Sequence, residues 1–151
     1  MDKAKFLKEE YIPLLKKLKG KEKGNWGVLS AQGMVEHMTD SIAEGSERIK
    51  RTLHTPGHLV QRYKDFAMSD KEFKPETKNA LMSETPSPLR HKNIDDAINE
   101  LQKEIADFFE YHKNNSGKII TNPFFGDLNY EEWLHLLHKH AIHHLKQFSL
   151  L

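Results

Sequence analysis

The chain has 151 residues, a length that suits one compact domain with a buried core. Its 23 Lys and Arg residues nearly balance its 22 Asp and Glu residues and are spread along the chain, so no basic stripe for nucleic acid is visible. Cysteine is absent, which excludes disulfides, thiolate metal sites and a cysteine nucleophile. Any metal must therefore be bound by His, Asp or Glu.

The distribution of apolar residues argues against membrane insertion. The first twenty residues carry charges throughout, and no later segment approaches the roughly twenty apolar residues of a membrane span. We therefore expect a soluble, cytoplasmic protein with neither a nucleic-acid nor a membrane partner.

The first helical pattern runs from Asp2 to Leu18, with apolar residues at three- and four-residue spacing. Pro13 lies inside this pattern and should bend or restart the helix. Gly20 and Gly24 end it, and the stretch GNWGVLS predicts a loop whose last residue, Ser30, is a typical N-cap.

Three further helices are predicted. The second covers Ala31–Leu53. The third begins at Asn93, an N-cap residue followed by an acidic first turn, and continues until the stretch KNNSGK stops it. The fourth begins at Asn129, with two glutamates in its first turn, and runs to the end of the chain.

About forty residues connect the second and third helices, which is too long for a tight turn between antiparallel neighbours. Short helical pieces are expected there, around Leu59–Phe66 and Glu76–Met82. Only GKIITNPFF has a strand pattern, and it looks too short and isolated to found a sheet. The prediction is an all-α single domain over residues 1–151, a four-helix bundle with a long crossover between helices 2 and 3.

Five of the ten histidines lie in the stretch WLHLLHKHAIHHLKQF near the C-terminus. At about 100° per residue, His140 and His144 share one face with the apolar residues that a bundle must bury, and Gln147 follows on the same side. His135 and His138 should point away among exposed positions. His143 should lie on the flank.

Two imidazoles at positions i and i+4 can converge on one cation, although a buried hydrogen-bonded histidine pair is equally open. In the second helix, His37 lies beside Met34 and Met38 and should face the interior. A single histidine in such a position belongs to the core or the surface more often than it binds a metal. With His140 and His144, His37 would complete a site of three neutral imidazoles that keeps open positions for water or substrate.

The remaining histidines fit a solvated surface; these are His54, His58, His91 and His112.

A divalent metal on three neutral ligands keeps nearly its full charge and can lower the pKa of bound water to about 7, or it can bind a small thiolate. Asp40, one turn after His37, is the best-spaced proton acceptor, with Glu44 one turn further. Both carboxylates could equally be solvated helix charges or groups that orient an imidazole. Gln147 can hydrogen-bond but cannot act as a base.

Aromatic residues could wall such a pocket or simply belong to the core; the candidates are Trp26, Trp133, Phe124 and Phe125. Hydrolysis and thiol transfer both stay open, beside a non-catalytic metal or small-ligand binding protein and a purely structural bundle.

Three segments together resemble the DinB/YfiT-like superfamily of metal-dependent bundle proteins: AQGMVEH with His37, NPFFGDLNYEEW, and HAIHHLKQF with His140, His144 and Gln147. The resemblance implies an up-down-down-up bundle, zinc or nickel on these three histidines, and a homodimer. It also implies a hydrolase, or a transferase that uses a low-molecular-weight thiol with a small-molecule substrate. The chain has HHLKQ where many members have a histidine followed by Arg-Gly-Gln, so no particular thiol is implied.

Overall fold

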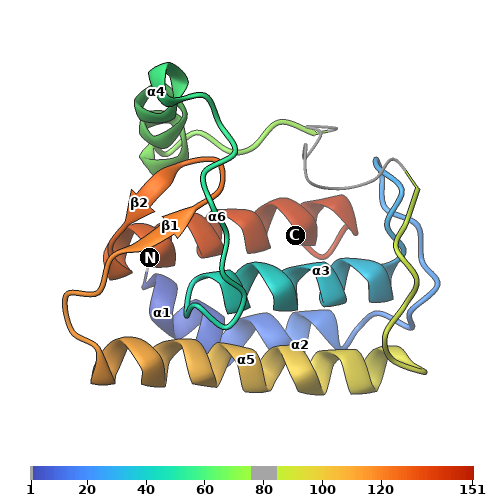
Figure 1. Ribbon diagram of the computed structural model, residues 1–151. Coiled ribbons are helices and arrows are strands. Elements are labelled where there is room, and N and C mark those ends of the chain that lie inside the picture. Colours follow the sequence, from blue (N-terminus) through green and yellow to red (C-terminus); the bar gives the residue numbers. More distant parts are fainter. Residues whose placement is uncertain (1, 76–84) are drawn as a thin grey trace.

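Helices make up most of the computed structural model, which describes residues 2–75 and 85–151 (Figure 1). A small antiparallel sheet of two strands, β1 (Ile120–Asn122) and β2 (Gly126–Leu128), precedes the last helix. The expected helix over Glu76–Met82 lies outside the described residues. No helix in the described ranges combines the length and the apolar character that a bilayer crossing requires.

The N-terminal helical segment is continuous but irregular. It consists of α1 (Lys3–Lys5), a π-helical turn η1 (Phe6–Glu10) and α2 (Tyr11–Leu15). The Tyr11 N–H donates to the Phe6 carbonyl, five residues earlier, as a π turn requires. Pro13 has no N–H for the carbonyl four residues before it, so the irregular turn comes just ahead of the proline that was expected to bend the helix.

The second helix is shorter than predicted: α3 covers Ala31–Glu44 instead of reaching Leu53. Its start is as expected, with the Ser30 hydroxyl accepting from the Gly33 N–H at 3.1 Å. The helix ends because Glu47 adopts a left-handed φ of 62° and the Arg48 N–H turns back to the Ala43 carbonyl.

The predicted starts of the last two long helices are confirmed. Asn93 caps α5 (Ile94–Asn114), and Asn129 caps α6 (Tyr130–Gln147). Asn129 and Glu132 form a reciprocal capping box, in which each side chain accepts from the other residue's backbone N–H. The α6 helix ends at Gln147, four residues before the C-terminus, because Ser149 has a left-handed φ of 58°.

The crossover contains α4 (Gly57–Met68), which confirms the predicted helical piece at Leu59–Phe66. A buried lysine of α6 fixes its C-terminal end. The Lys139 ammonium donates to the carbonyls of Phe66, Ala67 and Ser69 at 3.0–3.2 Å and so supplies a donor at a helix end, where carbonyl groups lack helical N–H partners.

The expectation that GKIITNPFF would form no sheet is wrong. Its residues supply β1, and the partner strand β2 follows after a turn, with Ile120 opposite Leu128. The Asn122 side-chain oxygen accepts from two backbone N–H groups of the turn, at residues 124 and 125. The Trp133 indole donates to the Ile120 carbonyl at 3.2 Å and so joins the hairpin to α6.

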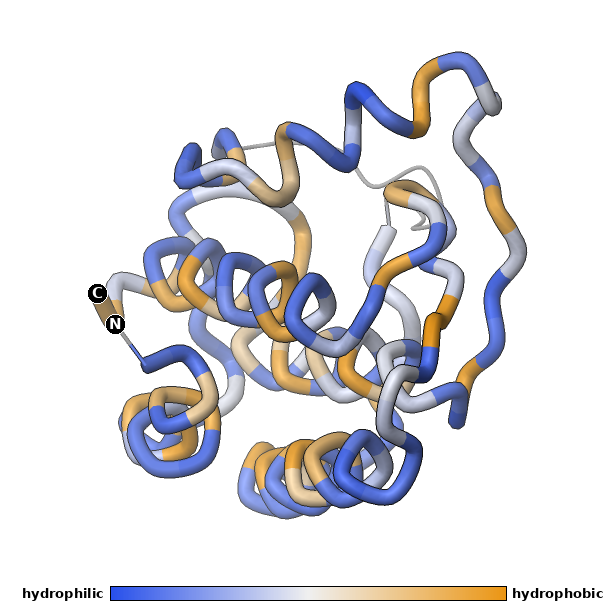
Figure 2. Tube along the Cα trace, turned by 90° about the vertical axis from the view of Figure 1, so that its left-hand side faces the viewer, coloured by the Kyte–Doolittle hydropathy of each residue, from blue (hydrophilic) through white to orange (hydrophobic). Residues whose placement is uncertain are grey.

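The N-terminal segment, α3, α5 and α6 supply most of the hydrophobic core, and α4 and the hairpin add Ala67, Ile120 and Leu128. The N-terminal segment and α6 run in one direction, and α3 and α5 run in the other (Figure 1). Hydrophobic residues of these segments face one another, while the outer faces carry hydrophilic ones (Figure 2). Because α3 and α6 are neighbours here, side chains from the two helices can share one site. The largest fully buried side chains include Trp133, Tyr11, Phe108, Met34 and Met38.

Candidate metal centre

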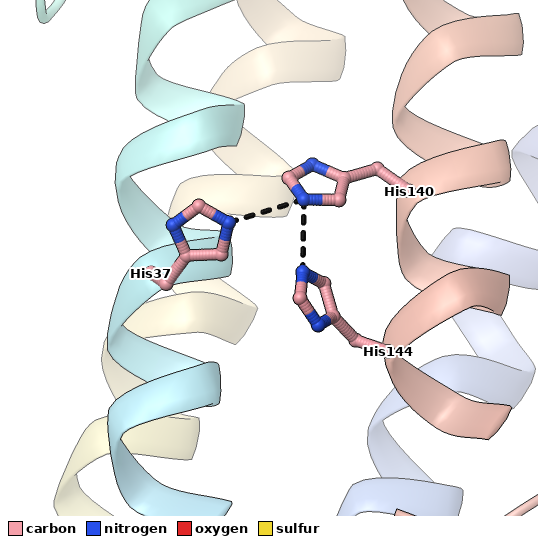
Figure 3. A group of neighbouring side chains, drawn as sticks. All are labelled: His37, His140 and His144. Carbon is pink, nitrogen blue, oxygen red and sulfur yellow. Dashed lines mark hydrogen bonds between the residues drawn. The ribbon is translucent and has the colours of Figure 1, made fainter. Parts of the chain in front are cut away.

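Three imidazoles from two helices converge on one point (Figure 3). His37 comes from α3, and His140 and His144 come from α6. The His140 Nε2 atom lies 3.1 Å from the His37 Nε2 atom and 2.9 Å from the His144 Nε2 atom. All three candidate ligand atoms lie within 4.8 Å of one another. The structure thus brings together the three histidines that the sequence singled out.

Helical periodicity explains this convergence. His140 and His144 are one turn apart on α6, so both project from the same face. On α3, His37 stands between the fully buried Met34 and Met38, which fix that helix face towards the core. His37 and His140 are half-buried, whereas only 6% of His144 is exposed.

Gln147 orients the innermost imidazole. Its amide nitrogen donates to the Trp26 carbonyl at 2.8 Å, which places its oxygen towards His144. That oxygen then accepts from the Nδ1–H of His144 at 2.7 Å. With Nδ1 protonated, the Nε2 atom of neutral His144 carries a lone pair that faces the other two rings.

The loop before α3 fits closely around Gln147. The Asn25 N–H donates to the Gln147 carbonyl at 2.7 Å. A Cβ on Gly24 would lie 2.7 Å from the Gln147 Cγ atom, and a Cβ on Gly27 would lie 3.0 Å from its Nε2 atom. Gly27 also has a φ of +76°, which strains any other residue. Both glycines therefore let the loop approach the side chain that holds His144.

The two close nitrogen contacts cannot both be hydrogen bonds between neutral rings. If the His140 Nε2 atom is protonated, it can donate to His144 but cannot accept from His37. If it is unprotonated, it can accept from His37, but it then faces the lone pair of His144. In either case, one of the two nitrogen–nitrogen contacts of His140 is not a hydrogen bond. A cation between the three nitrogens would satisfy all of them.

Burial keeps these rings neutral at physiological pH. Loss of solvent lowers the pKa of His37 to about 4, with repulsion from His143 contributing. Burial and repulsion from His37 lower the pKa of His144 to about 3. The pKa of His140 is also well below its usual value, through burial and its two histidine neighbours. A proton is therefore a poor occupant, and neutral imidazole is the form that binds metal.

The spacing of the nitrogens suits a metal ion. Metal–nitrogen bonds of about 2.0–2.1 Å place adjacent ligand nitrogens about 2.9 Å apart at octahedral angles and about 3.3 Å apart at tetrahedral angles. The two separations from the His140 nitrogen, 2.9 and 3.1 Å, lie in this range, and the ligand atoms of His37 and His144 lie within 4.8 Å of each other. The group could therefore hold a divalent ion, with coordination positions left for other ligands.

Asp40 lies one turn after His37, with its carboxylate bound to Arg90. Both carboxylate oxygens lie 3.1 Å from the Arg90 guanidinium, which also contacts Glu100 at 2.8 Å. Glu44, one turn further, pairs with Arg51 at 3.3 Å, and burial raises its pKa. Either carboxylate would have to give up an arginine contact to accept a proton.

Two of the four aromatic candidates are linked to the histidines of α6. Trp26 packs against His143 with ring centroids 5.3 Å apart, and Phe125 stacks on Phe73, whose ring edge faces His140. Trp133 belongs to the core and to the hairpin contact. Phe124 packs against His54 instead.

Several expectations about the other histidines are wrong. His112 is buried, because its Nε2–H donates to the Gly45 carbonyl at 2.7 Å within a cluster of aromatic rings. His135 is half-buried: its Nε2–H donates to the Ser69 carbonyl, and its Nδ1 accepts from Lys3. His138, also half-buried, packs against Phe6. The N-terminal segment and the crossover cover side chains of α6 that would be exposed on an isolated helix.

His91 is also half-buried, since its backbone N–H donates to the carboxylate of Glu36. His54 and His58 are exposed, as expected.

Sequence reasoning also missed Lys139 and Phe73. Lys139 is buried although its charge predicts exposure, and nothing in its local sequence indicates that another segment covers it. Phe73 lies in the crossover, and its ring approaches both His140 and His143. Nothing in its local sequence indicates this contact, because it depends on how the crossover returns to α6.

Comparison with known proteins identifies a family but no activity. Residues 12–150 match the family described as "Protein of unknown function (DUF1569)". No curated protein matches the chain, and no solved structure matches it. The expectation that the chain is a member of the DinB/YfiT-like superfamily is therefore wrong, because the family that matches is a different one. It rested on short motifs around the histidines, and such motifs can arise wherever two helices supply imidazoles. The chain belongs to the family of proteins of unknown function DUF1569.

Proposed function

We propose that the protein is a metal-dependent enzyme that activates water for hydrolysis. Its divalent metal is held by His37, His140 and His144, and water and substrate occupy the open coordination positions. The observation that carries the proposal is the convergence of three neutral imidazoles whose close nitrogen contacts cannot all be hydrogen bonds.

The chemistry follows from the charge of the site. Three neutral ligands leave the ion nearly its full positive charge, and such an ion can lower the pKa of bound water to about 7. His37 and His140 are partly exposed, and small molecules would reach the metal from this side of the site. A small thiol would bind to the metal in its thiolate form at the same open position. Thiol transfer is therefore a second reaction to be tested with the metal-loaded protein.

Zinc or nickel is the proposed ion. Imidazole nitrogens suit zinc, nickel, copper and iron, whereas magnesium and calcium prefer oxygen ligands. Gln147 fixes the His144 ring by accepting from its Nδ1–H, the arrangement by which many metal-binding histidines are oriented.

Asp40 is the proposed proton acceptor. It follows His37 by one helical turn, and release of one oxygen from Arg90 would free it for a proton. Asp40→Asn should lower turnover of metal-loaded protein while leaving metal content unchanged. Glu100→Gln is the matched control, because it removes the other carboxylate partner of Arg90 and leaves Asp40 in place.

The proposed architecture is a single domain over residues 1–151. Its N-terminal segment, α3, α5 and α6 form a four-helix bundle of the up-down-down-up type, with the site between α3 and α6. A homodimer is proposed as the solution state, and light scattering coupled to size-exclusion chromatography tests it.

Metal analysis of untagged protein tests the site. We expect about one zinc or nickel ion per chain in the wild type, and a loss of this metal in His37→Gln, His140→Gln and His144→Gln. His58→Gln, at an exposed position, is the matched control and should retain the metal. Equal metal content in the wild type and the three site variants would refute the assignment.

Activity assays test the enzyme proposal separately. Metal-loaded protein should hydrolyse members of a panel of esters and amides, and should lose this activity after chelation. Electrophiles offered with small thiols test the transfer reaction. A protein that binds one metal ion with no metal-dependent turnover of any class would be a binding protein instead.

A further inference from the structure

A second candidate site lies between the N-terminal segment, α5 and the start of α6. A hollow of about 620 Å³ is lined by residues of the N-terminal segment, α5 and the start of α6: Lys8, Ala106, Phe109, Glu110, His112, Lys113 and Tyr130. Its size is in the range of small-molecule sites. None of its lining residues belongs to the histidine triad. In Figure 2 the N-terminal segment and α5 are both seen end-on, at the lower left and lower centre.

His112 contributes a buried acceptor without a partner. Only 7% of this residue is exposed. Its Nε2–H donates to the Gly45 carbonyl at 2.7 Å, so the Nδ1 atom of the neutral ring carries the lone pair. This Nδ1 atom has no hydrogen-bond partner among the described residues. His112 lines the hollow, and its Nδ1 atom is a buried acceptor at that wall.

The surroundings of His112 are aromatic. The rings of Phe108, Tyr111 and Tyr130 lie 4.7–5.2 Å from its ring, measured between centroids. Phe109 adds a further ring to the lining. A planar, apolar body would find flat partners here, and a hydrogen-bond donor would satisfy the His112 acceptor.

The rim carries unpaired positive charge. The Lys8 ammonium lies 4.4 Å above the Phe109 ring, and Lys113 is exposed on α5. Within residues 2–75 and 85–151, neither ammonium forms an ion pair, while the Glu110 carboxylate accepts a hydrogen bond from Asn114. The two ammonium groups, of which that of Lys8 also contacts the Phe109 ring, outnumber the single Glu110 carboxylate in the lining, and this charge balance favours an anionic ligand.

We propose that this hollow binds a small aromatic acid that carries a hydroxyl or N–H donor. The aromatic ring lies among Phe109, Tyr130 and His112, the donor reaches His112 Nδ1, and the carboxylate lies near Lys8 and Lys113. This proposal does not depend on the metal centre.

Titration with 4-hydroxybenzoate, followed by ¹H–¹⁵N NMR and calorimetry, tests the proposal on the full chain. We expect saturable binding with shifts at the hollow, and at least about tenfold weaker binding of benzoate, which lacks the donor. Ala106→Trp fills the hollow from an exposed position and should abolish binding. Lys103→Trp, on the same helix but outside the lining, is the matched control and should bind normally.

The role of His112 has its own readout. His112→Phe keeps a ring but removes the acceptor, so it should bind 4-hydroxybenzoate and benzoate equally. Absence of binding in the millimolar range, unchanged binding by Ala106→Trp, or equal affinity of the wild type for the two acids would each overturn the proposal. The last result would leave an ordered water as the partner of Nδ1.

Discussion

The three imidazoles of the candidate metal centre should make the metal-free protein strongly sensitive to mild acid. In the unfolded chain a histidine has a pKa near 6.5. In the folded protein burial lowers the pKa of His37 to about 4 and of His144 to about 3, and the pKa of His140 is also well below normal. The unfolded state therefore binds more protons between these values, and stability falls as the pH falls below about 6.5.

The size of the effect follows from these values. At pH 5.5 an unfolded histidine gains about 1.4 kcal/mol from protonation, while a folded histidine with a pKa near 4 gains almost nothing. His37 and His144 alone give a loss of about 3 kcal/mol between pH 7.5 and pH 5.5, and the lowered pKa of His140 adds to this loss. A typical domain has a free energy of unfolding of about 5–15 kcal/mol, so this loss is large enough to measure.

Urea denaturation of chelator-treated protein at pH 7.5 and pH 5.5 measures the loss. The triple variant His37→Gln, His140→Gln, His144→Gln should lose about 3–4 kcal/mol less than the wild type, and His58→Gln should behave as the wild type. Other histidines titrate in all of these proteins, so their effect cancels in the comparison. The same pH dependence in the wild type and the triple variant would show that the rings are not held neutral by burial.

Three further outcomes are expected. Gly27→Ala should weaken zinc binding by about 10–100-fold, because its Cβ would displace the Gln147 amide that orients His144. Competition with a chromophoric chelator measures the zinc affinity, and an unchanged affinity would contradict this prediction. Gly45→Ala should lower the free energy of unfolding, measured in urea, by about 1–3 kcal/mol, since its Cβ would lie 3.0 Å from a buried phenylalanine ring. Gly57→Ala is the control and should have little effect, because its added Cβ would lie in open space. Lys139→Met should speed hydrogen exchange in α4, because three carbonyl groups at its C-terminal end each lose one donor. Exchange at the rate of the wild type would argue against this contact.

The sequence predicts local features of the fold well where the signal is itself local. Ser30, Asn93 and Asn129 all cap helices as expected, because a capping side chain bonds to backbone only three residues away. The end of α3 was missed because it depends on a left-handed residue, Glu47, which is not a typical residue for that conformation.

The hairpin shows the limit of a pattern taken from one segment. GKIITNPFF has strand character, but its partner, the short stretch Gly126–Leu128, has none that can be seen in isolation. The pairing forms because Asn122 organises the turn and Trp133 anchors the first strand. These contacts join different segments of the chain, so the strand preferences of individual residues do not predict them.

The candidate metal centre combines both situations. Spacing on one helix predicts that His140 and His144 share a face, and the apolar neighbours of His37 predict its direction. The surroundings were harder to predict. His112, His135 and His138 were assigned to the surface because a single helix cannot reveal which of its faces a long crossover or an N-terminal segment will cover.

The π turn at Phe6–Glu10 ties the start of the chain to the core through one extra residue. A π turn uses one residue more than an α-helical turn, so deleting one of the exposed residues between Leu7 and Tyr11 would leave a regular α-helix here. The buried residues Phe6 and Tyr11 would then be four residues apart and would still face inward together. The chain therefore has room to lose one residue in this stretch, whereas an inserted residue would turn the residues before it away from the core.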